Sequence, residues 1–114
     1  MKIKIIAFVS VILIAGFCFA GCGTPPIYGW ENYTENVYSN LKGGTSAESQ
    51  LSAMEKDLQK MLSKNKKVPP GFYAHLGMLA AEVNDRARAR ECFTEEKTRF
   101  PESAVFMDRF LARL

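Results

Sequence analysis

The stretch PGFYAHLGMLAAEVNDRARARECFTEEKTRFPES, residues 70–103, decides the fold of this 114-residue chain. Pro70 suits the first position of a helix, and Pro101 stops a second one. Between them, Asn84 can take the left-handed conformation that ends a helix, and Asp85 can cap the start of the next. The stretch therefore predicts two short helices joined by a tight turn, one over residues 72–83 and one from Asp85 to Phe100.

Small and large side chains alternate here at spacings that suit two closely packed antiparallel helices. Gly77 and Ala89 are expected where the helix backbones approach most closely, since a large side chain at either position would hold them apart. The spacing resembles a tetratricopeptide repeat, and the positions that carry the resemblance are Tyr73, Leu76, Gly77, Ala89, Phe93 and Pro101. In the repeat family that this spacing resembles, the position of Glu96 usually holds a small residue, so Glu96 departs from the pattern.

Periodic apolar residues predict three further helices. The first runs from Tyr28 or Trp30 to Leu41, with its stripe at Trp30, Tyr33, Val37 and Leu41. The second extends to about Lys64 from a capping box formed by Thr45 and Glu48. The third covers residues 102–114, with its repeating side at Val105, Phe106, Arg109, Phe110 and Leu114.

The expected fold is all-α, a short tetratricopeptide-like array of about five helices. No run of alternating polar and apolar residues predicts a strand. The pair of helices before residue 65 has the size of a second, divergent repeat, and the last helix is expected to cap the array against solvent. Five helices supply about two and a half repeats, which is close to the minimum for a continuous core.

The N-terminus has the order of residues typical of an export signal. Lys2 and Lys4 precede an apolar run over residues 5–20, which ends in small residues. The run is shorter than the ~20 residues that a membrane-spanning helix needs. A cleaved signal peptide is therefore favoured, and an uncleaved single-span anchor is the alternative.

The tetrapeptide Phe19-Ala20-Gly21-Cys22 resembles the lipobox of bacterial lipoproteins, although Phe19 replaces the usual leucine. The resemblance implies that the signal peptide, residues 1–21, is cut before Cys22 and that this cysteine becomes lipidated, with palmitate among the acyl chains. Two or three acyl chains anchor a protein stably where one does not. Residues 22–27 would form a lipidated tether, and residues 28–114 the helical domain. Gly23 in place of aspartate favours the outer membrane, facing the periplasm, in a two-membrane host.

Cleavage changes the charge balance and the cysteine count. Loss of Lys2 and Lys4 leaves 13 basic residues against 12 acidic ones, so the near-neutral mature chain lacks the basic footprint of a nucleic-acid-binding protein. Cys18 leaves with the signal peptide, and Cys22 carries lipid. Cys92 remains, either buried and inert or bridged to a partner.

No residue pattern points to catalysis, a cofactor, a metal or a small-molecule substrate. His75 has no second ligand at a metal-binding spacing, and Glu91, Glu95 and Glu96 are interpreted as part of a solvated, ion-paired helix face. Residues 86–90, RARAR, are either a solvated face or a patch for an anionic surface. The aromatic residues Tyr28, Trp30 and Tyr33 belong either to the core or to a membrane interface.

A wider resemblance covers nearly the whole mature chain. The lipobox, YGWENY, VPPGFYAHLG and FPESAVFMDRFL together resemble a family of uncharacterised bacterial lipoproteins, the DUF4810-like proteins. It implies a gene beside those of two other lipoproteins, one similar to the curli-secretion channel, and it implies no catalytic residues. We expect a non-enzymatic, membrane-anchored module that binds or assembles with another envelope protein. The alternative is a regulatory lipoprotein of a cell-wall (peptidoglycan) synthase.

Overall fold

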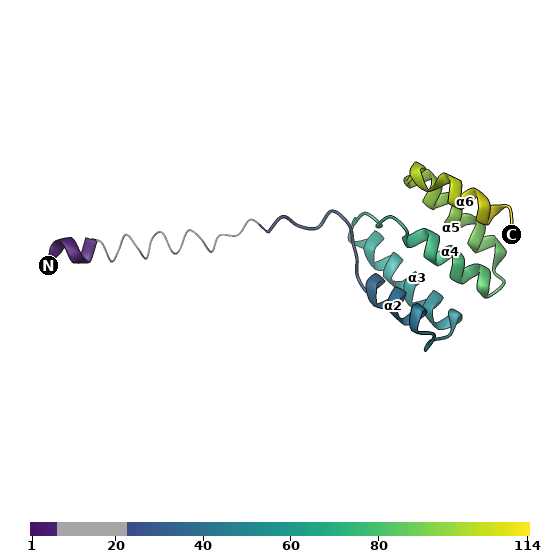
Figure 1. The fold of residues 1–114 in the computed structure, drawn as a ribbon, viewed down its shortest axis with the longest axis horizontal. Helices are drawn as coiled ribbons and strands as arrows, with labels where there is room; N and C mark the ends of the chain where they lie inside the picture. Colours follow the sequence, from purple (N-terminus) through teal and green to yellow (C-terminus); the bar gives the residue numbers. More distant parts are fainter. Residues whose placement is uncertain (7–22) are drawn as a thin grey trace.

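A computed structural model describes residues 1–6 and 23–114. The domain consists of helices that pack in chain order, each against the next (Figure 1). Cys22 and most of the predicted signal peptide lie outside the described residues. None of the described helices is both long and apolar enough to cross a membrane. The elements are α2 (Tyr33–Lys42), α3 (Ala47–Ser63), α4 (Phe72–Glu82), α5 (Arg86–Arg99), the 3-10 turn η1 (Pro101–Ser103) and α6 (Ala104–Leu111).

The predicted all-α fold is confirmed, and the helix pair at its centre is close to the predicted bounds. α4 begins at Phe72 as expected and α5 ends one residue before Phe100. Asn84 adopts φ 64°, and the Asp85 side chain accepts a hydrogen bond from the backbone N–H of Arg88 at 3.0 Å. These local signals succeed because each acts within one turn of the chain.

The first helix begins later than predicted. Trp30 does not open it, because the chain before α2 is held in a non-helical path across the end of α3. The Gly29 N–H donates to the Lys67 carbonyl at 2.9 Å, beside an isolated parallel bridge between Tyr28 and Lys67. Glu31 then takes φ 38° before α2 starts at Tyr33.

Two further boundaries differ from the sequence-based expectation. Ser46, and not Thr45, caps α3, and its side chain accepts from the Ser49 N–H at 3.3 Å. The last predicted helix is divided into η1 and α6. Its expected repeating side is wrong for Val105 and Phe106, which face solvent. The side that packs on α5 instead consists of Met107, Phe110, Leu111 and Leu114.

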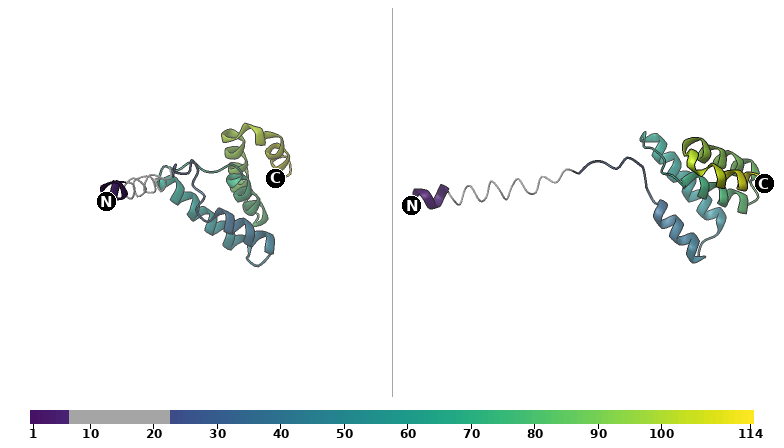
Figure 2. Two further views of the ribbon diagram at one scale, coloured as in Figure 1. Left: turned by 60° about the vertical axis from the view of Figure 1, so that its left-hand side comes forward. Right: turned by 45° about the horizontal axis from the view of Figure 1, so that its top comes forward.

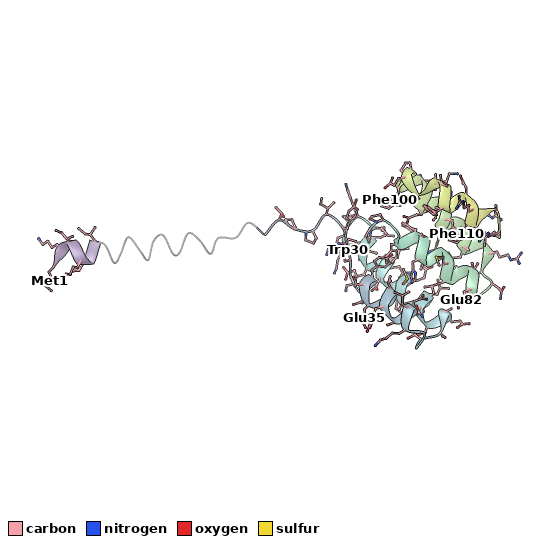
Figure 3. All side chains as sticks on the ribbon, in the orientation of Figure 1. Met1, Trp30, Glu35, Glu82, Phe100 and Phe110 are labelled. Atoms are coloured by element: carbon pink, nitrogen blue, oxygen red, sulfur yellow. The ribbon has the colours of Figure 1, made fainter. Side chains whose placement is uncertain are left out.

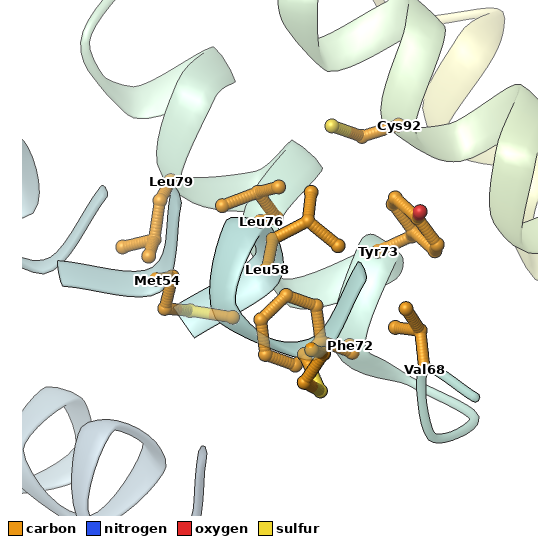
Figure 4. Packing of buried hydrophobic residues seen from close by; sticks show 9 residues of the cluster. Met54, Leu58, Val68, Phe72, Tyr73, Leu76, Leu79 and Cys92 are labelled. Carbon is orange, nitrogen blue, oxygen red and sulfur yellow. The ribbon is translucent and has the colours of Figure 1, made fainter. Parts of the chain in front are cut away.

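The core forms where α3 meets α4. Figure 4 shows side chains of α3, among them Met54 and Leu58, against Phe72 and Leu76 of α4, with Cys92 reaching in from α5. A second cluster joins α4 and α5 to α6, and in it the rings of Phe93 and Phe110 stack with centroids 5.2 Å apart.

Gly77 sets how closely α4 and α5 approach. A Cβ atom there would lie 2.7 Å from Cε1 of Phe93 and 3.2 Å from Cβ of Cys92. The Phe93 ring is buried and stacks on Phe110, so it cannot move away from α4 without disturbing that contact. A glycine inside this helix therefore has a packing reason that outweighs its low helix propensity.

Glu96 provides the N-terminal cap that α4 lacks in its own sequence. The residue at the cap position is Gly71, which has no side chain to accept a hydrogen bond. The expectation that Glu96 lies on a solvated helix face is wrong, because it is 2% exposed. Its carboxylate reaches across from α5 and accepts from the N–H groups of Gly71 at 2.7 Å and Ala74 at 3.3 Å. A carboxylate is favoured there because the first turn of a helix presents unpaired N–H groups and a positive dipole end.

Substitution of Gly77 by alanine should destabilise the domain by about 1–3 kcal/mol, because the new methyl group overpacks the contact with Phe93. Urea unfolding of both proteins measures the difference. Gly44→Ala is the control, since a Cβ at Gly44 meets nothing within 4 Å. An unchanged or higher stability of Gly77→Ala, as at an ordinary helical glycine, would contradict the close approach.

Glu96→Ala should lower the free energy of unfolding by about 1.5–3 kcal/mol, because two partly buried, charge-assisted hydrogen bonds are lost and the N–H groups of Gly71 and Ala74 lose their acceptor. The matched control is its neighbour Glu95, whose exposed pair with Arg99 at 2.7 Å should be worth about 0.5 kcal/mol. Equal changes in the free energy of unfolding for the two substitutions would show that the Glu96 cap contributes no more than an exposed ion pair.

Candidate binding surface

An apolar groove runs along the outer side of α2. It has a volume of about 370 Å³. Thr34 is the one non-aromatic polar residue in its wall, so a ligand would meet mainly aromatic and aliphatic carbon. The lining residues, which we call the α2 groove, are Trp30, Tyr33, Thr34, Val37, Tyr38 and Leu41.

The α2 groove contains the apolar stripe that the sequence analysis assigned to the first helix, but the two ends of the stripe, Trp30 and Leu41, are exposed. α2 has no buried residue. Leu41 is 80% exposed and Trp30 is 46% exposed, so side chains expected in a core lie at the surface. Exposed apolar side chains that gather in one place are characteristic of interaction sites.

The polar side of α2 explains this orientation. Asn32 and Asn36 each donate a side-chain hydrogen bond to the Asp57 carboxylate of α3, both at 3.1 Å. Asp57 is buried, and burial of a carboxylate without such partners would be costly. These bonds turn the asparagine side of α2 towards α3 and leave much of the opposite side open.

Tyr33 connects the α2 groove to the core. Its ring lies 5.2 Å from that of Phe72 and stacks on Trp30 at 6.1 Å. Burial raises the pKa of the Tyr33 hydroxyl, and the negative charge of Glu96 raises it further. Of the three aromatic residues near the tether, Tyr33 packs against the core, Tyr28 is partly buried and Trp30 is largely at the surface.

The residues predicted to pack the helix pair lie between α4 and α5, with one exception. Tyr73, Leu76 and Gly77 are buried on α4, and Ala89 and Phe93 are buried on α5. Pro101 is exposed at the start of η1, where it ends α5. Cys22, the predicted lipidation site, is not among the described residues.

The charged side of α5 is ion-paired. Arg88 lies between two carboxylates, 2.7 Å from Glu55 of α3 and 2.8 Å from Glu91. The hydrogen bonds that Arg88 donates to the Glu55 carboxylate are the main cause that raises the pKa of the Arg88 guanidinium. Arg88 thus joins two helices, while Arg86 and Arg90 on either side are exposed.

Among the described residues, Cys92 and His75 are the candidates for a nucleophile or a base, and both are shielded from solvent. Burial raises the pKa of the Cys92 thiol to about 12, so it stays protonated near neutral pH. Burial also lowers the pKa of His75, whose Nε2 atom has no hydrogen-bond partner. Its ring meets the edge of Tyr33 at 6.3 Å. Across residues 1–6 and 23–114, no three side chains that could bind a metal ion come together.

Two features of this surface were not predicted. Tyr38 lines the α2 groove beside Val37, with the Lys42 ammonium 4.7 Å from its ring centroid. The asparagines that turn α2 outward, Asn32 and Asn36, could have been noticed from their spacing of four, which places them on one helix face. Their partner Asp57 could not, because it lies 21 residues or more away.

Comparison with known proteins adds a family. Searches of curated proteins and of solved structures found no match to the chain. The sequence profile described as "Domain of unknown function (DUF4810)" matches residues 27–110, which include the α2 groove and all helices from α2 to α5. The chain therefore belongs to the DUF4810 family.

Proposed function

We propose that this chain is a lipid-anchored protein of the bacterial envelope that binds another envelope protein through the α2 groove. The observation that carries the proposal is the exposed apolar groove on α2, in a helix that contributes no buried residue to its own domain. A partner would bury aromatic and aliphatic area there, which is the main favourable contribution to protein association.

The anchor part of the proposal is supported by the lipobox-like tetrapeptide before Gly23 and by the chain that follows it. Four residues lie between Cys22 and Ile27, so five Cα-to-Cα steps span at most about 18 Å when extended. A lipidated Cys22 would keep the groove near the membrane and restrict encounters to partners at the same surface. Such confinement raises the effective concentration of a membrane-bound partner.

The helix arrangement supports a binding role by analogy. The spacing of Tyr73, Gly77 and Phe93 resembles a tetratricopeptide repeat, a class of fold that presents extended surfaces to other proteins. The partner we favour is a lipoprotein similar to the curli-secretion channel, as the family resemblance implies. Its apolar segment would occupy the α2 groove with Trp30 and Leu41 at the two ends.

The anchor is tested on the N-terminal peptide. Mass spectrometry of protein purified from membranes should show a chain that starts at Cys22 and carries acyl groups, and Cys22→Ser should abolish both processing and acylation. An unmodified Cys22, or an intact Met1, would contradict the anchor.

The groove is tested by paired substitutions of exposed apolar residues. Tyr38→Ser with Leu41→Gln should weaken partner binding about tenfold or more, because each buried apolar side chain contributes about 1.5–3 kcal/mol. Val105→Gln with Phe106→Gln is the matched control, since both residues are exposed on α6.

Binding is measured with the acylated full-length protein, first by affinity purification from membranes and then by titration with the purified partner. Recovery of a curli-channel-like lipoprotein that the groove variant loses and the α6 variant retains supports the proposal. Recovery of a peptidoglycan synthase instead would support the regulatory alternative. Equal loss in both variants would show that the groove is not the site.

A further inference from the structure

Four lysines gather where the N-terminal segment enters the domain. We call Lys60, Lys64, Lys66 and Lys67 the basic end. Lys60 lies in the last turn of α3, and the others follow before α4. Glu31 lies among them, with its carboxylate 2.6 Å from Nζ of Lys60, 3.5 Å from Nζ of Lys64 and 3.9 Å from Nζ of Lys66.

The basic end concentrates the positive charge of the mature chain. Its four lysines exceed Glu31 by three charges. The remaining charged residues after Gly21 are nine basic and eleven acidic, so they carry a net charge of the opposite sign. A charge distribution of this kind orients a protein in the field of a charged surface. An anionic surface would attract the basic end and not the rest of the domain.

Exposed apolar side chains flank the basic end. The Gly29 backbone lies directly on α3, since a Cβ there would be 2.8 Å from Cγ of Met61. Its hydrogen bond to the Lys67 carbonyl holds the segment before α2, which we call the entry segment, beside the lysines. Ile27, 72% exposed, and Trp30 lie on either side of this contact, and Figure 3 shows Trp30 where the tether joins the domain.

We propose that the basic end, with Ile27 and Trp30 at its edge, docks on the anionic phospholipid surface of the membrane that holds the anchor. This inference rests on the proposed lipidation of Cys22. Lysine ammonium groups would contact lipid phosphates, and Trp30 would enter the headgroup zone, which tryptophan favours. Each lysine near such a surface strengthens binding about fivefold.

The tether supports contact of this surface with lipid rather than with a distant partner. Ile27 can lie no farther than about 18 Å from an acylated Cys22. Over that range the electrostatic attraction acts within one or two screening lengths, since the Debye length is about 8 Å at physiological salt. The basic end is also the end of the domain that the tether enters, so docking needs no turn of the domain (Figure 1).

Docking at the basic end leaves the α2 groove accessible. α2 starts beside Trp30 and has ten residues. At 1.5 Å rise per residue, its far end lies about 15 Å from its start. In the docked orientation that we infer, α2 points away from the lipid, so Leu41 stands clear of the surface and a partner protein can still reach the groove. Docking and partner binding use different residues except for Trp30.

Trp30 makes the test direct because it is the chain's single tryptophan. The acylated protein is reconstituted into vesicles of phosphatidylcholine alone, or with one quarter phosphatidylglycerol, that carry brominated acyl chains. Trp30 fluorescence should be quenched and shifted to the blue in the anionic vesicles only. The triple variant Lys64→Gln, Lys66→Gln, Lys67→Gln should lose about a hundredfold in docking, and so its quenching.

The control removes three positive charges elsewhere. Arg86→Gln, Arg90→Gln and Arg113→Gln alter exposed arginines, none of which forms an ion pair among the described residues. This variant should be quenched like the parent protein. Salt at 1 M, where the Debye length falls to about 3 Å, should abolish the difference between the two vesicle types. Far-ultraviolet circular dichroism checks that both triple variants remain folded.

A transplanted tryptophan tests the orientation. In Trp30→Phe with Leu41→Trp, the reporter lies at the far end of α2 and should not be quenched. Equal quenching at positions 30 and 41 would show that α2 lies flat on the membrane, and would overturn docking through the basic end. The absence of Trp30 quenching in anionic vesicles would overturn it as well.

Flotation separates failure of the anchor from failure of docking. A lipidated chain floats with neutral vesicles whatever its lysines do. If the chain does not float with neutral vesicles, the proposed anchor is wrong. Flotation with anionic vesicles then measures docking without the anchor. Salt-sensitive flotation that the lysine variant loses would still support the basic end. No flotation with either vesicle would contradict both proposals.

Discussion

The contact of Glu96 with the start of α4 is the interaction on which the rest of the domain depends. The buried Glu96 carboxylate joins α5 to the turn between α3 and α4 and to the first turn of α4. The same turn accepts the Gly29 N–H through Lys67, and its Gly71 lies against the hydroxyl of Tyr33. The Glu96 carboxylate therefore links α5 to the same turn that holds the segment before α2.

Two kinds of contact hold neighbouring helices together in this domain. α3, α4 and α5 share apolar cores, in which Gly77 allows Phe93 to approach the α4 backbone. α2 joins α3 largely through amide donors to Asp57, which are directional and require little apolar area. Much of the apolar side of α2 is thereby left exposed. A helix attached in this way can present a binding groove without loss to the core beneath it.

Signals confined to one turn of chain were predictable from the sequence, and signals between distant residues were not. Asn84 and Asp85 placed the turn between α4 and α5, because a left-handed residue and a side-chain cap act locally. The late start of α2 depends on the contact of Gly29 with Lys67. The exposure of its apolar residues depends on the hydrogen bonds to Asp57. The spacing of the apolar residues predicted the helix α2, but spacing alone does not say which neighbouring element packs against those residues. Glu96 looked like a departure from the repeat pattern, and its role appears only when α5 lies beside α4.

The order of the helices also bears on how the chain folds. The principal contacts join elements that are adjacent in sequence, from α2 with α3 through to α5 with α6 (Figure 2). Short loops close at little entropic cost, and domains built from local contacts fold in microseconds to milliseconds. The helix pair α4 and α5 can form first and act as a template, on which α3 and α6 then assemble from either side. A chain with this topology can complete its core without waiting for distant segments to meet, which shortens the time that its apolar stripes are exposed to solvent during folding.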